Sequence, residues 1–149
     1  MTSTTRAIIG AAAGLAYGWV LWFMCIFAAG GGHGTNAPLL LTPAPLSLLF
    51  LMCTAGEPFF LAALYAVPVL WASIGGLSAL DGRWRKLAVG LLVLHYASGL
   101  SVMAINGVDL KGINGKIPEG FIAWVPVYVA GQLALWWRLA RGDRSQPRA

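Results

Sequence analysis

Four polar side chains are candidates for a polar or ligand site that could do chemistry: His33, Glu57, His95 and Ser98. His95 and Ser98 stand three positions apart in an apolar run, so a helix would place both on one face. An ionisable group within a membrane helix is costly, and it suggests proton transfer or ligand binding. The alternative is a neutral histidine hydrogen-bonded inside the protein, with Tyr96 and Gln132 as candidate partners.

His33 and Glu57 flank a proline-containing apolar segment. If that segment enters the membrane and returns on the same side, the two side chains meet at the surface. There the pair could bind a cation or a polar head group, or relay a proton. The alternative is a solvated loop histidine and a carboxylate at a helix N-terminus, where negative charge is favoured.

Motifs of the common enzyme classes are absent from the sequence. It has no Walker loop, HExxH or GxSxG motif, and no second histidine three or four residues from His95. We therefore expect no metal and no cofactor, assign no catalytic residue, and expect the protein not to be an enzyme.

The composition is that of a membrane protein. Of 149 residues, 58% are hydrophobic and 10% charged, against roughly 45–50% and about 25% in soluble domains. A membrane helix needs about 20 apolar residues, and uncharged runs near that length cover 7–29, 59–80, 87–105 and 121–137. These runs are too long and too evenly apolar for barrel strands. The sequence predicts an all-α integral membrane bundle of four transmembrane helices in a single domain, 1–149. The first helix exceeds a signal-peptide core of roughly 7–15 residues, so we expect it to be retained.

Basic residues set the expected orientation. One cluster is Arg83, Arg85 and Lys86, and the basic tail 138–149 carries Arg138, Arg141, Arg144 and Arg148. Such residues mark cytoplasmic loops, so both regions, and the N-terminus with Arg6, are predicted to be cytoplasmic in a bacterial inner membrane. The net charge of +5 is explained by this placement, and no nucleic-acid partner is expected.

The stretch 39–54 is too hydrophobic for an ordinary loop, and Pro43 and Pro45 interrupt it. With Thr42 as N-cap and Pro43 at the first helical position, a helix over about 42–54 is predicted. It would be about 18 Å long, short of the roughly 30 Å core, and so re-entrant or interfacial. The alternative is a fifth span over about 37–56, which places the N-terminus outside.

Gly10, Gly14 and Gly18 repeat every four residues and form one helix face that another backbone can approach closely. Its partner is either a second protomer or other membrane protein, or the run 59–80 of the same chain. That run has small pairs of its own, Ala72 with Gly76 and Gly75 with Ala79.

The run GGGHGTNAP, followed by PAPLSLL and later by YAVPVLW and LHYASGL, resembles a group of small bacterial multi-pass membrane proteins. These share a Gly-Gly-His-Gly-Thr loop and a short proline-containing apolar segment. The resemblance implies that the His33 loop is a feature of a protein type. It implies no activity and supplies no catalytic residues.

Three functions remain from the sequence. The first is a structural or accessory membrane protein that packs through its glycine face, with the lipid bilayer and a homo-oligomer or other membrane protein as partners. The second is a small transporter or ligand-binding protein that uses His95 and the half-helix. The third is a metal- or haem-dependent membrane redox protein that uses His33, Glu57 and His95.

Overall fold

The computed structural model describes residues 2–29, 37–44, 62–107, 117 and 119–142. The described residues are helical without a strand, so the all-α prediction is confirmed for them. Within these residues, three helices are long and apolar enough to cross a membrane, which indicates membrane association. They are α1 (Ser3–Ala29), α6 (Arg83–Asn106) and α7 (Glu119–Gly142).

The helix of the second predicted span ends at Ser78 in the structure, close to its predicted end at Leu80. Its apolar helical stretch covers Ala62–Ser78, about 25 Å at 1.5 Å per residue. Helix α5 proper is Val67–Ser78, preceded by a break at Ala66. Pro68 explains the break, because its ring nitrogen carries no N–H to continue the hydrogen bonds of the preceding turn. Residues 59–61 of the predicted run lie outside the described residues.

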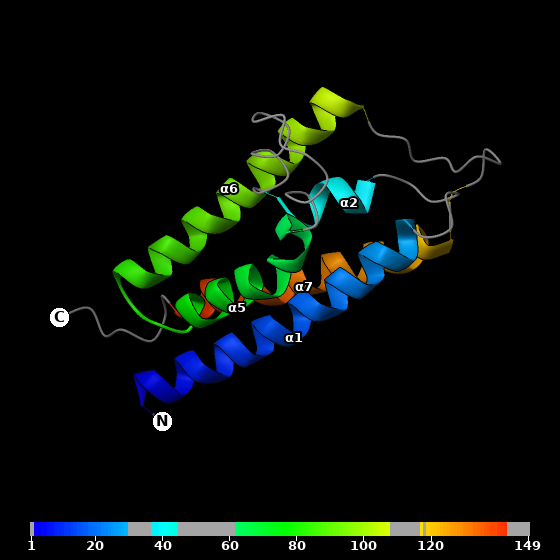
Figure 1. The fold of residues 1–149 in the computed structure, drawn as a ribbon. Helices are drawn as coiled ribbons and strands as arrows, with labels where there is room; N and C mark the ends of the chain where they lie inside the picture. Colours follow the sequence, from blue (N-terminus) through cyan, green and yellow to red (C-terminus); the bar gives the residue numbers. More distant parts are fainter. Residues whose placement is uncertain (1, 30–36, 45–61, 108–116, 118, 143–149) are drawn as a thin grey trace.

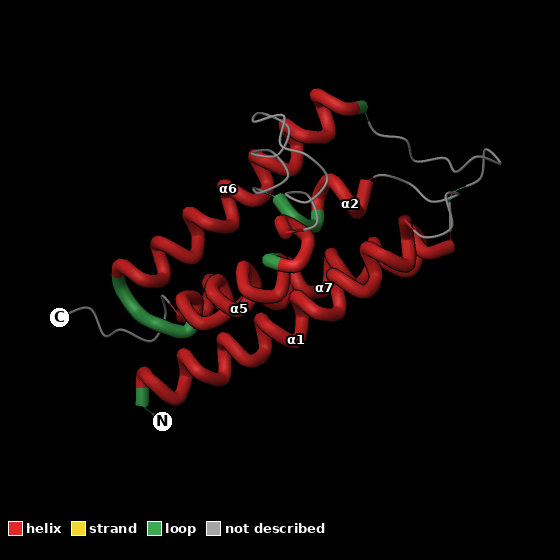
Figure 2. Tube along the Cα trace, in the orientation of Figure 1, coloured by secondary structure: helices red, strands yellow, loops and turns green. Residues whose placement is uncertain are grey.

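Helices α1, α5, α6 and α7 run alternately in opposite directions (Figures 1 and 2). The start of α1, the α5–α6 connection and the C-terminal end of α7 therefore lie at one end of the bundle. An ion pair of 3.2 Å joins Arg6 to Asp81 there. The connection turns tightly because Gly82 adopts a φ of 64°, a conformation that costs glycine little.

A short helix, α2 (Ala37–Leu41), packs against α6 (Figure 1). It ends in a turn in which the Thr42 N–H donates to the Pro38 carbonyl at 2.9 Å. The predicted half-helix therefore does not begin at Thr42, because Thr42 to Ala44 close the end of α2 instead. Residues 45–54 lie outside the described residues.

The core lies where α1 and α5 meet, with α6 and α7 against them. Its fully buried members include Leu21, Cys25, Trp71, Ile74 and Leu92. Large apolar side chains of α1, α6 and α7 also face outward, among them Phe23, Leu100 and Leu133. An exposed apolar surface of this extent suits contact with lipid.

Candidate functional site

The predicted glycine face of α1 lies directly against α5. A Cβ atom at Gly10 would meet the carbonyl oxygen of Gly75. One at Gly14 would meet the carbonyl oxygen of Trp71. At Gly18 it would come within 2.5 Å of an α5 backbone atom. The two backbones are thus in contact, and a helix of the same chain occupies this face.

His95 lies in the middle of α6, and only 1% of its surface is exposed. Its Nδ1 atom is 2.7 Å from the carbonyl oxygen of Ala44. Its Nε2 atom is 2.8 Å from the hydroxyl oxygen of Tyr128. A carbonyl can only accept, so Nδ1 carries the proton and Nε2 of the neutral ring accepts from the Tyr128 hydroxyl. Both ring nitrogens are thereby used within the chain.

Further hydrogen bonds continue from Tyr128 along α7. The Tyr17 hydroxyl donates to the Tyr128 carbonyl at 2.9 Å, and the Gln132 amide donates to the Tyr17 hydroxyl at 3.2 Å. The Tyr96 hydroxyl donates to the side-chain carbonyl oxygen of Gln132 at 2.6 Å. Trp136 donates to the Tyr96 hydroxyl at 3.0 Å. This set of bonds, together with those of His95, is called the His95 network below.

Aromatic rings surround the His95 network. Trp71 meets the His95 ring edge-on, with centroids 5.1 Å apart, and also meets Tyr17 at 5.2 Å. Trp124 stacks on Tyr128 at 4.7 Å. Rings of this size exclude water, and a hydrogen bond in such low-dielectric surroundings is stronger than one in water.

The His95 network joins three long helices and the turn after α2. Tyr17 belongs to α1, His95 and Tyr96 to α6, and Tyr128 and Gln132 to α7. Ala44 adds the turn. Such a network can fix the positions of helices; a catalytic role would need a ring nitrogen exposed to a substrate.

No protein-family model, curated protein sequence or solved structure matches this chain.

Some predicted site residues are brought together and others are not. Ser98 is buried on α6 with 2% of its surface exposed, and within the described part of the chain it makes no hydrogen bond to His95. The candidate partners Tyr96 and Gln132 bond to each other instead of to His95. His33 and Glu57 lie outside the described residues, so their proposed pairing stays a prediction.

Sequence reasoning missed Tyr128, Tyr17 and Ala44. A signal for Tyr128 was present, because it precedes Gln132 by four residues and so shares its helix face. The sequence cannot indicate the Ala44 carbonyl as a partner, because every residue has a backbone carbonyl. Among the described residues, no group of three His, Cys, Asp or Glu side chains could hold a metal ion.

Proposed function

We propose that this protein is a structural or accessory multi-pass protein of a bacterial inner membrane, without catalytic activity of its own. The observation that carries the proposal is the His95 network. His95 is the type of residue from which intramembrane chemistry would be expected, yet both of its nitrogens hold neighbouring segments together. A hydrogen-bonded polar network whose centre, at His95 and Gln132, is buried makes a bundle rigid and specific.

We further propose four spans, with both termini in the cytoplasm and the segment after the first helix entering from the outer side. The Arg6–Asp81 ion pair supports this topology, because it holds the start of α1 beside the α5–α6 connection. The burial of Ala37, Thr42 and Ala44 supports entry of that segment into the bundle. A reporter enzyme that is active only outside the cytoplasm, fused to the N-terminus, should be inactive. Activity there would favour five spans.

Any protein partner has to pack its helices away from the face at Gly10, Gly14 and Gly18, because α5 occupies that face. A homo-oligomer or a complex with another membrane protein would then use the lipid-facing side chains of α1, α6 or α7.

Proteoliposomes that enclose a pH-sensitive dye test the proposal against proton transport. With the membrane potential clamped, the purified protein is expected to give the same slow leak as empty vesicles, and His95→Ala should leave that leak unchanged. A flux that exceeds the leak of empty vesicles and disappears in the His95→Ala variant would overturn the accessory function and favour a transporter. Tyr65→Phe serves as the matched control, since the Tyr65 ring is exposed and lies against Trp22 away from the His95 network.

A further inference from the structure

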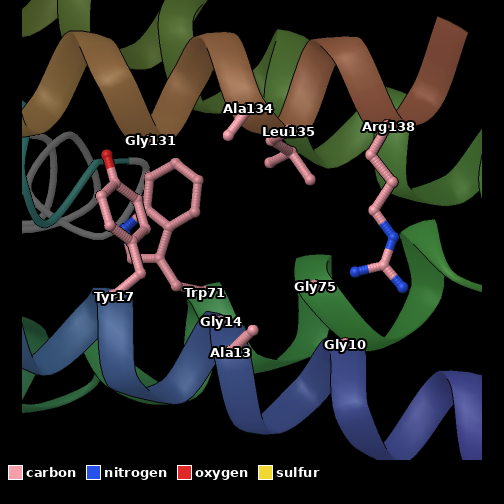
Figure 3. A pocket seen from close by; sticks show the side chains of 10 residues that line it. All are labelled: Gly10, Ala13, Gly14, Tyr17, Trp71, Gly75, Gly131, Ala134, Leu135 and Arg138. Carbon is pink, nitrogen blue, oxygen red and sulfur yellow. The ribbon is translucent and has the colours of Figure 1, made fainter.

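An apolar cavity of about 240 Å³ opens between α1, α5 and α7 (Figure 3). Apart from Leu135, glycine and alanine form its side walls, among them Ala13 and Gly14 of α1 and Gly131 and Ala134 of α7. Protein interiors are normally close-packed. Here the small side chains leave space that none of the described residues fills. Ala13 and Ala134 are exposed, so the cavity opens sideways, in the direction from which lipid approaches a bundle.

The two ends of the cavity differ in chemistry. Tyr17 and Trp71 close one end with their aromatic rings. At the other end the side chain of Arg138 extends from α7 towards α1 and α5, so that its guanidinium lies over the cavity (Figure 3). The cavity therefore combines an apolar body with a single cationic end.

Arg138 differs from the other arginines of the described residues. Arg6 and Arg85 both lie within 4 Å of Asp81. The guanidinium of Arg83 lies 4.8 Å from the centre of the Trp84 ring, and that of Arg141 lies 4.3 Å from the Trp137 ring. Within the same part of the chain, Arg138 has neither an ion-pair partner nor an aromatic ring beneath it. A half-buried guanidinium left in this way favours an anion that comes from outside the protein.

We infer that this cavity binds one phospholipid with an anionic head group. Its phosphate lies at Arg138, and one acyl chain runs between α1 and α7 towards Tyr17 and Trp71. A guanidinium holds a phosphate through two parallel hydrogen bonds, and the apolar walls match a hydrocarbon chain. This inference stands on the cavity and does not depend on the function proposed above.

Native mass spectrometry of the full chain in detergent tests the inference, with dioleoyl phosphatidylglycerol and dioleoyl phosphatidylcholine as probes. The wild type should bind one phosphatidylglycerol at least tenfold more tightly than phosphatidylcholine. Glycerol phosphate, which offers the same phosphate without acyl chains, should not bind. Equal binding of the two lipids, or binding of glycerol phosphate as tight as that of phosphatidylglycerol, would overturn the inference.

Two arginines of the same helix provide a matched pair of variants. Arg138→Gln should weaken phosphatidylglycerol binding about tenfold, as expected for the loss of a charge-assisted hydrogen bond. Arg141→Gln removes the same charge one turn away, where the guanidinium lies over Trp137, and should change binding less than twofold. Equal losses in both variants would mean that only net charge attracts the lipid, which contradicts a site at Arg138.

Filling the cavity tests the position of the acyl chain. Ala134→Phe and Ala13→Phe place a ring in the cavity from opposite walls, and each should weaken phosphatidylglycerol binding at least tenfold. Ala12→Phe, at an exposed position of α1 outside the cavity, should leave binding unchanged. Both alanines are exposed, so a larger side chain should be tolerated at either position. If one variant fails to fold, the other still tests the site. Unchanged binding in a folded filling variant would refute the site.

Discussion

The Nε2 atom of His95 accepts a hydrogen bond from the hydroxyl of Tyr128 at 2.8 Å, and this bond joins the middle of α6 to the middle of α7. The backbones of these two helices do not pack closely along their length in the described residues. Long polar side chains bridge them instead. The energetics of the bundle should therefore respond to the loss of single hydroxyl groups.

Tyr128→Phe removes the hydroxyl that donates to His95 and keeps the ring that stacks on Trp124. The His95 Nε2 atom is then left without its donor in a buried site. We expect the free energy of unfolding in mixed micelles to fall by about 1–2 kcal/mol. Tyr65→Phe, at an exposed ring, should change it by less than about 0.5 kcal/mol. Equal effects of the two variants would argue against the hydrogen bond as the source of stability.

The bond between Tyr96 and Gln132 can be measured by a double-mutant cycle. The variants Tyr96→Phe and Gln132→Leu, alone and combined, should give a coupling energy of about 0.6–1.7 kcal/mol, the range for hydrogen bonds between membrane helices. Combining Tyr96→Phe with Tyr65→Phe should give additive losses within about 0.5 kcal/mol. A coupling near zero for the first pair would mean that the 2.6 Å contact contributes nothing to folding.

Gly14→Ala tests the contact between α1 and α5, because the added Cβ atom would meet the Trp71 carbonyl. Neither backbone can yield locally, so the helices must separate, and we expect a loss of about 1–3 kcal/mol in unfolding free energy. Gly90→Ala makes the same change on α6, where nothing lies within 4 Å of the new atom. It should leave stability unchanged or raise it by up to about 1 kcal/mol. A tolerated Gly14→Ala would show that the two helices are not in backbone contact.

Asp81→Asn removes the carboxylate that pairs with Arg6 at 3.2 Å and lies 3.7 Å from Arg85. The Asp81 side chain is 46% exposed, so water and salt screen both pairs. We expect a loss below about 1 kcal/mol at low salt, and a smaller loss in 1 M sodium chloride. A larger loss that salt does not reduce would indicate that this end of the bundle is more deeply buried than the structure places it.

The sequence alone predicted the helical class and three of the apolar spans, because burial in lipid demands long uninterrupted apolar helices. It also predicted a close-packing face at Gly10, Gly14 and Gly18, since spacing by four is a property of the helix itself. The position of the break in the second span, at Ala66, came only from the structure. Hydropathy does not register that Pro68 interrupts the hydrogen-bonding of the helix that contains it.

Only the tertiary structure decided what His95 does. Its hydrogen bonds reach Ala44 and Tyr128, which lie 51 and 33 residues away along the chain. The partner group on Ala44 is a backbone carbonyl, which every residue type carries. Hydropathy and residue spacing describe a single helix. The hydrogen-bond partner of a side chain depends on which helices pack together and on how far each is shifted along its axis relative to the others. The same limit applies to the cavity beside Arg138, which exists because small residues from three separate helices face one another.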